Sequence, residues 1–397
     1  MYRKTYVEID LDNLYDNVKN LINEYNEYDY YFGVVKGSCY GHGEYCVNTL
    51  IEAGINYLAI SSLEEALRIR KYNNTIPILC LEPINLEFID ICEKNNITIT
   101  IHDYDYFKEL IKMNINTKIK VHLKIDSGMN RLGLKDKNEI KEICEFLVNN
   151  EKILLEGIYT HFGTSGLYDK CYDNQISSFL ESTSLIDLKI FKIVHLDKSI
   201  TMIAHPKLSF ANGARLGIIM YGYNQLHKPN ISNLRSKLRQ LKKEYRKKKL
   251  NVSETFDECI VPLKPSYKLI SEVIQVKKIK KGEHVGYGEI YTAEKDCIVA
   301  VVPIGYADGF SLENAGRYVL INKKRYKIID IVMMGMIILE VDENVHVHDK
   351  VILIGDEIKL IEVSMHNHST QHETLCRANS NIPRVYIKNN EIVYIQE

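Results

Sequence analysis

The sequence predicts an α/β protein in which a (β/α)8 TIM barrel is followed by a mainly antiparallel β domain. Two patterns support this prediction. Before residue 222, eight β-rich runs alternate with amphipathic stretches that have helical spacing, such as residues 63–70. After about residue 263, strands follow one another with only short turns between them. Such an order is typical of antiparallel pairing.

The spacing of the β runs predicts the first domain. A second domain is expected because the chain has 397 residues, and single hydrophobic cores stop growing near about 250–300 residues. Periodicity alone fits a doubly wound open sheet almost as well as a barrel, because both folds alternate strands and helices. The runs are expected at residues 30–35, 57–61, 77–81, 97–101, 119–125, 154–160, 192–196 and 213–221.

The domain limits follow from the change of pattern. We place the barrel domain at residues 1–240 and the β domain at 241–397, with an extra linker segment at 225–262. Over 234–250 the linker carries nine Lys or Arg against one Glu, with leucines at helical spacing. This pattern predicts a basic amphipathic helix on a solvated surface. The strands expected in the β domain include 271–276, 297–302 and 317–321.

Composition excludes several classes of protein. The net charge is -1, so no overall field attracts the chain to nucleic acid or to an anionic membrane. Residues 1–10 lack the apolar core of a signal peptide, and no apolar stretch reaches membrane-spanning length. We therefore expect a cytoplasmic protein. The nine cysteines lack C-x-x-C pairing, and the histidines at 366, 368 and 372 lack Cys or acidic ligands at set spacing, so we expect reduced thiols and no metal site.

Lys36 ends the first β run and leads directly into Tyr40-Gly41-His42-Gly43. An amine at a strand's carboxyl end, beside glycines that allow close approach of the backbone, could capture a carbonyl cofactor as a Schiff base. A single strand-end lysine more commonly extends to the surface. Other polar residues follow later strands, and in a barrel they would share one rim with Lys36: Lys124, Arg131, His161, Ser199 and Arg215.

The residue types at this rim suit a small anionic, carbonyl-bearing cofactor. Ser199 and the backbone amides of Gly217 and Ile218 suit a phosphate, which favours unpaired N–H groups at a turn or helix start. Arg131 offers a bidentate fork for a carboxylate.

Seven motifs in order closely resemble those of bacterial alanine racemases, and together they cover nearly the whole chain except the segment 225–262. Two contain tyrosines braced by glycine, although a tyrosine near a strand end is by itself usually a packing residue. The motifs are Val35-Lys36 with Tyr40-Gly41-His42-Gly43, Gly128-Met129-Asn130-Arg131-Leu132-Gly133, Tyr159-Thr160-His161-Phe162, Arg215-Leu216-Gly217-Ile218-Ile219-Met220-Tyr221-Gly222, Gly286-Tyr287-Gly288, Pro303-Ile304-Gly305-Tyr306-Ala307-Asp308-Gly309 and Ile382-Pro383-Arg384-Val385.

The resemblance implies a pyridoxal 5'-phosphate (PLP) enzyme that interconverts L-alanine and D-alanine, supplies D-alanine for peptidoglycan and works as a homodimer with shared active sites. Lys36 would hold the cofactor and act as one catalytic base, and Tyr287 of the partner subunit would be the other. Arg215 would bond the pyridine nitrogen. His161 would link this arginine to the catalytic tyrosine.

The resemblance also implies roles for the remaining positions. Lys124, often carbamylated in the family, would orient Arg131. The cofactor's phosphate side would contact Tyr40, Ser199, Gly217, Ile218 and His372. The amino-acid substrate would contact Arg131, Tyr306 and Met334.

Some positions depart from the family pattern. Between the lysine and the tyrosine stand Gly37, Ser38 and Cys39, and His372 stands where the family usually has a tyrosine. An arginine, a cysteine and an aspartate of the family become Ile331, Met333 and Gly335. These departures leave open a serine/alanine racemase of broader specificity.

Two further alternatives share the barrel and its lysine. A non-catalytic PLP-binding protein would resemble the barrel alone, so Tyr287 and the β domain argue against it. A barrel-type amino-acid decarboxylase would need a substrate-acid motif with a reactive cysteine in the β domain, and the sequence offers none.

Overall fold

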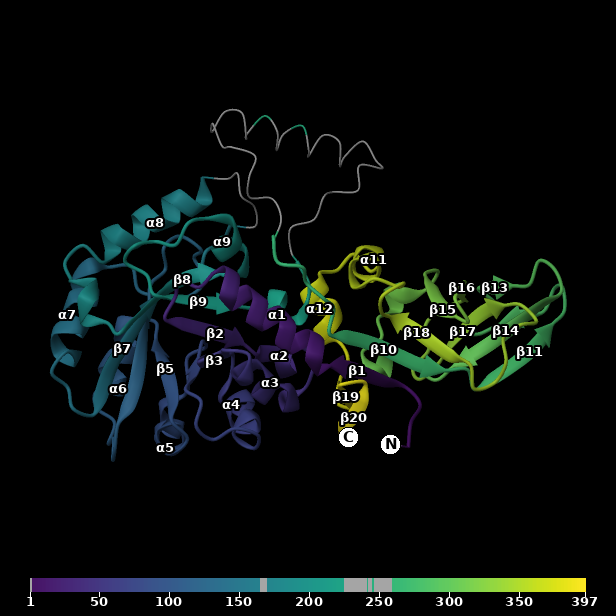
Figure 1. Cartoon of the computed structure of the whole chain (residues 1–397), viewed down its shortest axis with the longest axis horizontal. Coiled ribbons are helices and arrows are strands. Elements are labelled where there is room, and N and C mark those ends of the chain that lie inside the picture. The colour runs from purple at the N-terminus through teal and green to yellow at the C-terminus, as the bar shows by residue number, and fades with distance from the viewer. Residues whose placement is uncertain (1, 165–169, 225–240, 242–244, 246–258) are drawn as a thin grey trace. The chain divides into compact units, whose positions relative to one another are not determined.

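The computed structural model describes residues 2–164, 170–224, 241, 245 and 259–397 (Figure 1). They form two compact units, which we call the barrel unit, Asp16–Lys36 and Val47–Leu263, and the β unit, Met1–Tyr15, Gly37–Cys46 and Lys264–Glu397. Most of the expected linker and of its basic helix lies outside the described residues. The predicted boundary at residue 240 therefore stays a prediction.

The barrel unit contains a closed barrel of eight parallel strands, which confirms the predicted fold class and excludes the open sheet. Closure comes from pairing of the first barrel strand with the last, where Tyr30 faces Gly213. The strands are β2 (Tyr30–Val34), β3 (Tyr57–Ile60), β4 (Ile78–Cys80), β5 (Ile97–Ile101), β6 (Ile119–Lys124), β7 (Ile153–Tyr159), β8 (Ile193–Lys198) and β9 (Gly213–Leu216).

Short helices alternate with these strands, and side-chain caps start several of them. Ser62 forms a capping box with Glu65 at the start of α4, and Asp103 and Asp136 cap α6 and α7. The helices of the barrel unit are α3 (Val47–Glu52), α4 (Leu63–Arg70), α5 (Ile89–Lys94), α6 (Tyr104–Leu110), α7 (Lys137–Leu147), α8 (Cys171–Ser182) and α9 (Ser199–Ala204), with single 3₁₀ turns such as η4 (Ile218–Tyr221).

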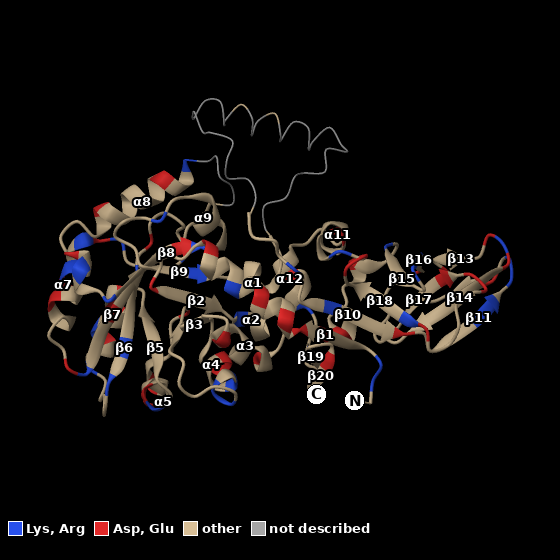
Figure 2. Ribbon diagram, in the orientation of Figure 1, with Lys and Arg blue, Asp and Glu red and all other residues tan. Residues whose placement is uncertain are grey.

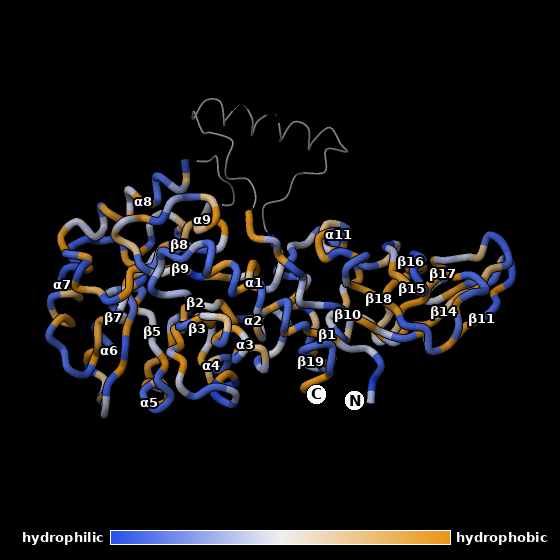
Figure 3. Tube along the Cα trace, viewed as in Figure 1, coloured by the Kyte–Doolittle hydropathy of each residue, from blue (hydrophilic) through white to orange (hydrophobic). Residues whose placement is uncertain are grey.

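The β unit is built on a ten-stranded sheet in the order β11-β14-β17-β16-β15-β18-β10-β1-β19-β20, with antiparallel pairing throughout except between β1 and β19. Apolar residues run along these strands (Figure 3). The strands are β1 (Tyr6–Asp10), β10 (Tyr267–Glu272), β11 (Gln275–Ile279), β14 (Cys297–Val302), β15 (Tyr318–Ile321), β16 (Lys324–Ile329), β17 (Ile337–Val341), β18 (Lys350–Ile354), β19 (Arg384–Lys388) and β20 (Glu391–Gln396), beside the hairpin of β12 (His284–Val285) and β13 (Tyr291–Thr292).

The structure differs from the sequence-based expectations in three places. Residues 271–276 form no single strand, because the backbone N–H groups of Val273 and Ile274 bond two different neighbours and separate β10 from β11. The first strand, β1, which continues into α1 (Leu11–Glu24), belongs to the β sheet although residues 1–15 were assigned to the barrel domain. The β unit also contains two helices too short for helical spacing to reveal, α11 (Leu360–His366) and α12 (Gln371–Cys376).

Along the described chain, Lys and Arg are interspersed with Asp and Glu (Figure 2). Among the described helices none is both long and apolar enough to span a bilayer. The described residues also include no cluster of three or more His, Cys, Asp or Glu side chains placed to hold a metal ion.

Candidate active site

Lys36 follows β2 and is half-buried. The next four residues, Gly37 to Tyr40, all have positive φ, so they form a left-handed turn. Each non-glycine residue there costs about 1–2 kcal/mol relative to a right-handed conformation. Hydrogen bonds from Gly41 N to Gly37 O and from Gly43 N to Ser38 O, both 2.9 Å, hold the turn. Backbone strain of this kind clusters at functional sites, which supports the choice of Lys36.

Arg215 lies buried in β9, and its two terminal nitrogens are held by the barrel backbone. Nη1 donates to the carbonyl of His195 at 2.6 Å, and Nη2 donates to the carbonyls of Thr160 and Leu196 at 2.7 and 2.9 Å. Burial lowers the pKa of Arg215 to about 10, so the side chain stays cationic at neutral pH. Nε has no acceptor among the described residues and is available to a ligand.

Lys124, at the end of β6, is 5% exposed, and its Nζ lies 4.6 Å from the centre of the Tyr159 ring. Burial, followed by the positive charges of Arg215 and Arg131, lowers the pKa of Lys124 to about 7. Near neutral pH much of this lysine is therefore an uncharged amine. An uncharged amine is a nucleophile, whereas an ammonium group is not.

A shallow pocket brings several predicted residues together. Burial, followed by the charge of Arg215, lowers the pKa of His161 well below its usual value, so its imidazole is neutral at pH 7. Arg131 is exposed at the mouth, where its guanidinium can meet an anion. The lining residues are Lys124, Ile125, Asp126, Met129, Arg131, Leu132, Thr160 and His161.

The predicted phosphate donors of the barrel unit also lie together. Gly217 N donates to Ser199 Oγ at 2.8 Å. Ser199 starts α9 and Ile218 starts η4, so both stand where backbone N–H groups lack acceptors within their own helix. This donor set is uncharged and suits a phosphate.

In the β unit, the substrate-side candidates Tyr306 and Met334 lie on two loops joined by backbone bonds. Tyr306 N donates to Met333 O at 3.0 Å, and Ala307 N donates to Met334 O at 2.9 Å. Asp308 anchors the Tyr306 loop. Its carboxylate accepts from Gly305 N and from the guanidinium of the partly exposed Arg3, with which it forms an ion pair. Both candidate side chains are exposed.

Tyr287 stands on a sharp turn whose backbone is fixed while its side chain is 66% exposed. Its N–H donates to Asp330 Oδ2 at 3.2 Å. Gly286, with φ of 82°, leaves the room that Asp330 needs, because a Cβ there would meet the carboxylate at 1.6 Å. Sequence analysis missed Asp330, which acts on the backbone and belongs to no catalytic residue pattern.

Tyr40 and His372, predicted to share the phosphate side, are neighbours within the β unit. Their ring centres are 5.7 Å apart and the planes are tilted by 50°. His372 is the second residue of α12.

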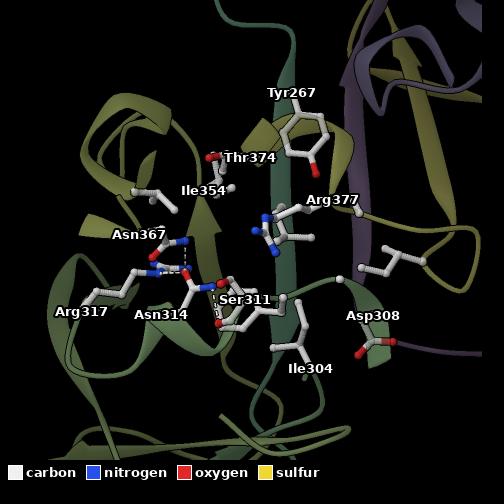
Figure 4. A pocket seen from close by; sticks show the side chains of 16 residues that line it. Tyr267, Ile304, Asp308, Ser311, Asn314, Arg317, Ile354, Asn367, Thr374 and Arg377 are labelled. Carbon is white, nitrogen blue, oxygen red and sulfur yellow. Dashed lines mark hydrogen bonds between the residues drawn. The ribbon is translucent and has the colours of Figure 1, made fainter. Parts of the chain in front are cut away.

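A second, small pocket lies in the β unit, and none of the predicted site residues line it (Figure 4). The buried Arg317 donates from Nε to Asn314 Oδ1 at 2.5 Å and from Nη1 to the carbonyls of Tyr318 and Leu353. Arg317 Nη2 and Asn367 Oδ1 have no partner among the described residues. Burial lowers the pKa of Arg317 to about 9.

Sequence analysis also gave no role to three polar residues inside the barrel, His122, Glu156 and His195. All three are buried and hydrogen-bonded. A signal did exist, because each histidine interrupts an apolar run at a position flanked by Val and Leu. A polar residue in such a run must find a partner in the core.

Two family models match the chain in order. Residues 9–225 match the N-terminal domain of alanine racemase, and residues 266–386 match its C-terminal domain. Among curated proteins, alanine racemase 1 of Bacillus subtilis is 32% identical over 401 residues, covering 100% of this chain and 96% of the relative. The alanine racemase of Geobacillus kaustophilus is 33% identical, with coverage of 100% and 97%.

Solved structures give the same picture. The alanine racemase of Bacillus anthracis with bound L-Ala-P superposes with a TM-score of 0.86 at 30% identity and covers 100% of this chain and 98% of that structure's chain. A histidine racemase of Leuconostoc mesenteroides superposes with a TM-score of 0.81 at 22% identity, covering 98% and 99%. The latter likeness concerns the fold alone.

Proposed function

The chain belongs to the alanine racemase family of isomerases, and from this we propose that it is a PLP-dependent enzyme that interconverts L-alanine and D-alanine with two bases, Lys36 and Tyr287. The observation that carries the proposal is the way in which the hydrogen bonds of Arg215 are distributed. A buried cation whose Nη1 and Nη2 are committed to carbonyls keeps one donor, Nε, for a ligand. Lys124 and His161 lie within electrostatic reach of it.

The donor set fits the cofactor. Lys36 supplies an amine that can bond an aldehyde, and Arg215 supplies a donor for a ring nitrogen. Ser199 and the amides of Gly217 and Ile218 would be the uncharged donors for a phosphate, with the Gly217 amide exchanging its bond to Ser199 Oγ for one to the phosphate. We place Tyr40 and His372 on the same phosphate. When bound, PLP acts as the electron sink that makes the substrate Cα–H acidic.

Inversion at Cα requires a base on each face of a planar carbon. We propose that Lys36 takes or returns the proton on one face and that the Tyr287 hydroxyl does so on the other. Tyr287 is supplied by the partner subunit, which accounts for an exposed side chain on a rigid turn. The enzyme is then a homodimer with shared active sites.

Arg215 contributes selectivity. Its pKa of about 10 keeps the guanidinium a donor at neutral pH, so it bonds the ring nitrogen without transferring a proton to it. By leaving the ring nitrogen unprotonated, Arg215 would favour racemisation over transamination. His161, neutral beside Arg215, passes the interaction on to the catalytic tyrosine.

Lys124 and Arg131 handle the substrate carboxylate together with Tyr306 and Met334. With a pKa near 7, Lys124 has an uncharged amine that can add carbon dioxide. The resulting carbamate is an anion and would relieve the repulsion between Lys124 and its neighbours Arg131 and Arg215. We propose that carbamylated Lys124 orients Arg131.

We further propose that the enzyme acts in the cytoplasm and supplies D-alanine for peptidoglycan. The test of function is racemisation of L-alanine and of D-alanine by the PLP-loaded protein, followed by circular dichroism. The test of the cofactor site is borohydride reduction and peptide mapping, which should find a pyridoxyl group on Lys36. A label on another lysine, or no optical change with either enantiomer, would contradict the proposal.

A further inference from the structure

Behind Arg215, a chain of buried hydrogen bonds crosses the barrel interior. Arg215 Nη1 lies 2.9 Å from His195 Nδ1, His195 Nε2 lies 2.9 Å from His122 Nδ1, and His122 Nε2 lies 3.4 Å from Glu156 Oε2. We call His195, His122 and Glu156 the relay. We propose that the relay locks both histidines in their Nε2–H tautomers, so that His195 always accepts from Arg215, and that Glu156 and His122 are positioning residues for the reaction.

The two ends of the chain dictate one direction for every proton. Arginine can only donate, so His195 Nδ1 must carry a lone pair and its proton must lie on Nε2. His122 Nδ1 then accepts from His195, which leaves the His122 proton on Nε2. A carboxylate can only accept, so Glu156 receives this proton. The donor-only end and the acceptor-only end therefore require the same tautomers.

Packing prevents the histidines from adopting another arrangement. The His195 ring is stacked between Phe32 and Tyr159, with centre distances of 4.4 and 4.7 Å. The backbone makes room for both rings. A Cβ on Gly157 would approach the His122 ring to 2.6 Å, and a Cβ on Gly213 would approach His195 Cβ to 2.8 Å.

Glu156 is suited to be the carboxylate that ends this chain of hydrogen bonds. It also accepts from Tyr57 OH at 2.8 Å and lies 3.3 Å from Lys120 Nζ. Burial raises the pKa of Glu156, but the hydrogen bonds from His122 and Tyr57 and the charge of Lys120 outweigh it, so the pKa lies below its usual value. Burial lowers the pKa of both His122 and His195, so the two rings are neutral.

Fixed histidine tautomers affect catalysis only if Arg215 contacts the cofactor. The catalytic role of the relay therefore rests on the proposed function. If His195 Nδ1 were protonated, a donor would face the guanidinium of Arg215. The arginine would then shift, and with it the Nε donor offered to the ring nitrogen. Residues that hydrogen-bond to a ligand-binding side chain and orient it typically contribute about 10–100-fold in activity.

The tautomers can be read directly by 15N solid-state NMR of the full-length PLP-loaded protein labelled at histidine. Signals are assigned with His122→Gln and His195→Gln. In the wild type we expect Nδ1 unprotonated and Nε2 protonated in both rings. In Glu156→Leu the acceptor is gone, so mixed tautomers and a drop in kcat of about 10–100-fold are expected. Glu156→Gln keeps an acceptor oxygen and should restore both readouts.

Lys120→Met is the matched control, because it removes a charge next to Glu156 without touching the chain of bonds. It should leave the tautomers and kcat unchanged. A protonated Nδ1 or an imidazolium at His195 in the wild type would overturn the proposal, as would unchanged tautomers in Glu156→Leu. The wild-type spectrum and Glu156→Gln decide the matter even if Glu156→Leu does not fold. Because the spectrum needs no turnover, a protein with the expected tautomers but no racemisation would refute the proposed function and leave the lock standing.

Discussion

Arg215 of the barrel unit and Arg317 of the β unit are both buried, and their guanidinium groups are held differently. Arg215 has both terminal nitrogens satisfied by carbonyls, while its Nε remains for a ligand. Arg317 uses Nε and Nη1 on Asn314, Tyr318 and Leu353, while its Nη2 is buried without a partner among the described residues. The first arrangement presents a donor, whereas the second joins a loop to two strands.

The same contrast extends to the other candidate residues. At the barrel rim, Lys124 and Arg215 are buried and their charges are tuned by their surroundings. In the β unit, Tyr287, Tyr306 and Met334 are exposed and only their backbones are fixed. Under the proposed function, the barrel would set the electrostatics of the site, and the exposed side chains of the β unit would be those that act across the interface of a homodimer.

The largest effect should come from separating these two contributions. Lys36→Ala and Tyr287→Phe each remove one base, so each should lose racemisation by about 100-fold or more. When the two variants are mixed, a heterodimer has one site with neither lesion, so part of the activity should return. If subunit exchange is proven and no activity returns, the active sites are not shared. The control is Tyr245→Phe, which changes an exposed tyrosine that has no role in the proposed site.

A second prediction tests the two arginines against each other. Arg215→Lys and Arg317→Lys each leave buried carbonyls unpaired, at about 1–3 kcal/mol for each group, so both should lower the free energy of unfolding. Only Arg215→Lys should also lower kcat, by about 100-fold, because it removes a donor to the reacting system. Urea titrations and racemisation assays measure the two quantities. A comparable loss of kcat in Arg317→Lys would contradict the distinction between an arginine that binds a ligand and one that only supports the fold.

A feature of the fold or of the candidate site could be predicted from the sequence when the residues that mark it are close together along the chain. Lys36 is marked by its position at a strand end and by the motif that follows, and the eight strands are marked by apolar runs. The relay is different, because His122, Glu156 and His195 lie on the three strands β6, β7 and β8 and acquire their roles only when these strands pair. The partnership of Asp330 with the Tyr287 turn likewise joins residues 43 positions apart.

A third prediction uses the pKa of Lys124, which folding lowers from 10.5 to about 7. Burial and the positive charges of Arg215, Arg131 and Lys36 lower this pKa, and the opposing charge of Asp126 only partly offsets them. Between pH 7 and 10.5 the unfolded chain binds the proton and the folded chain does not, so this lysine makes the stability rise with pH across that window. In Lys124→Met the rise should be smaller. Thermal unfolding of the two proteins in carbon dioxide-free buffer measures it, and parallel curves would contradict the lowered pKa.

The smallest effect concerns substrate choice. His372 lies beside Tyr40 where the family usually has a tyrosine, and a Cβ added at Gly335 would meet nothing within 4 Å. Histidine is smaller than tyrosine and offers a ring nitrogen that can bond a hydroxyl. A pocket that only tolerates an extra hydroxyl discriminates by about 100-fold or less, so alanine should remain the best substrate with measurable serine turnover. His372→Tyr should lower the serine-to-alanine ratio of kcat/KM by a few-fold, with Cys376→Ser in the same helix as the control. An unchanged or higher ratio would show that position 372 does not set the choice between serine and alanine.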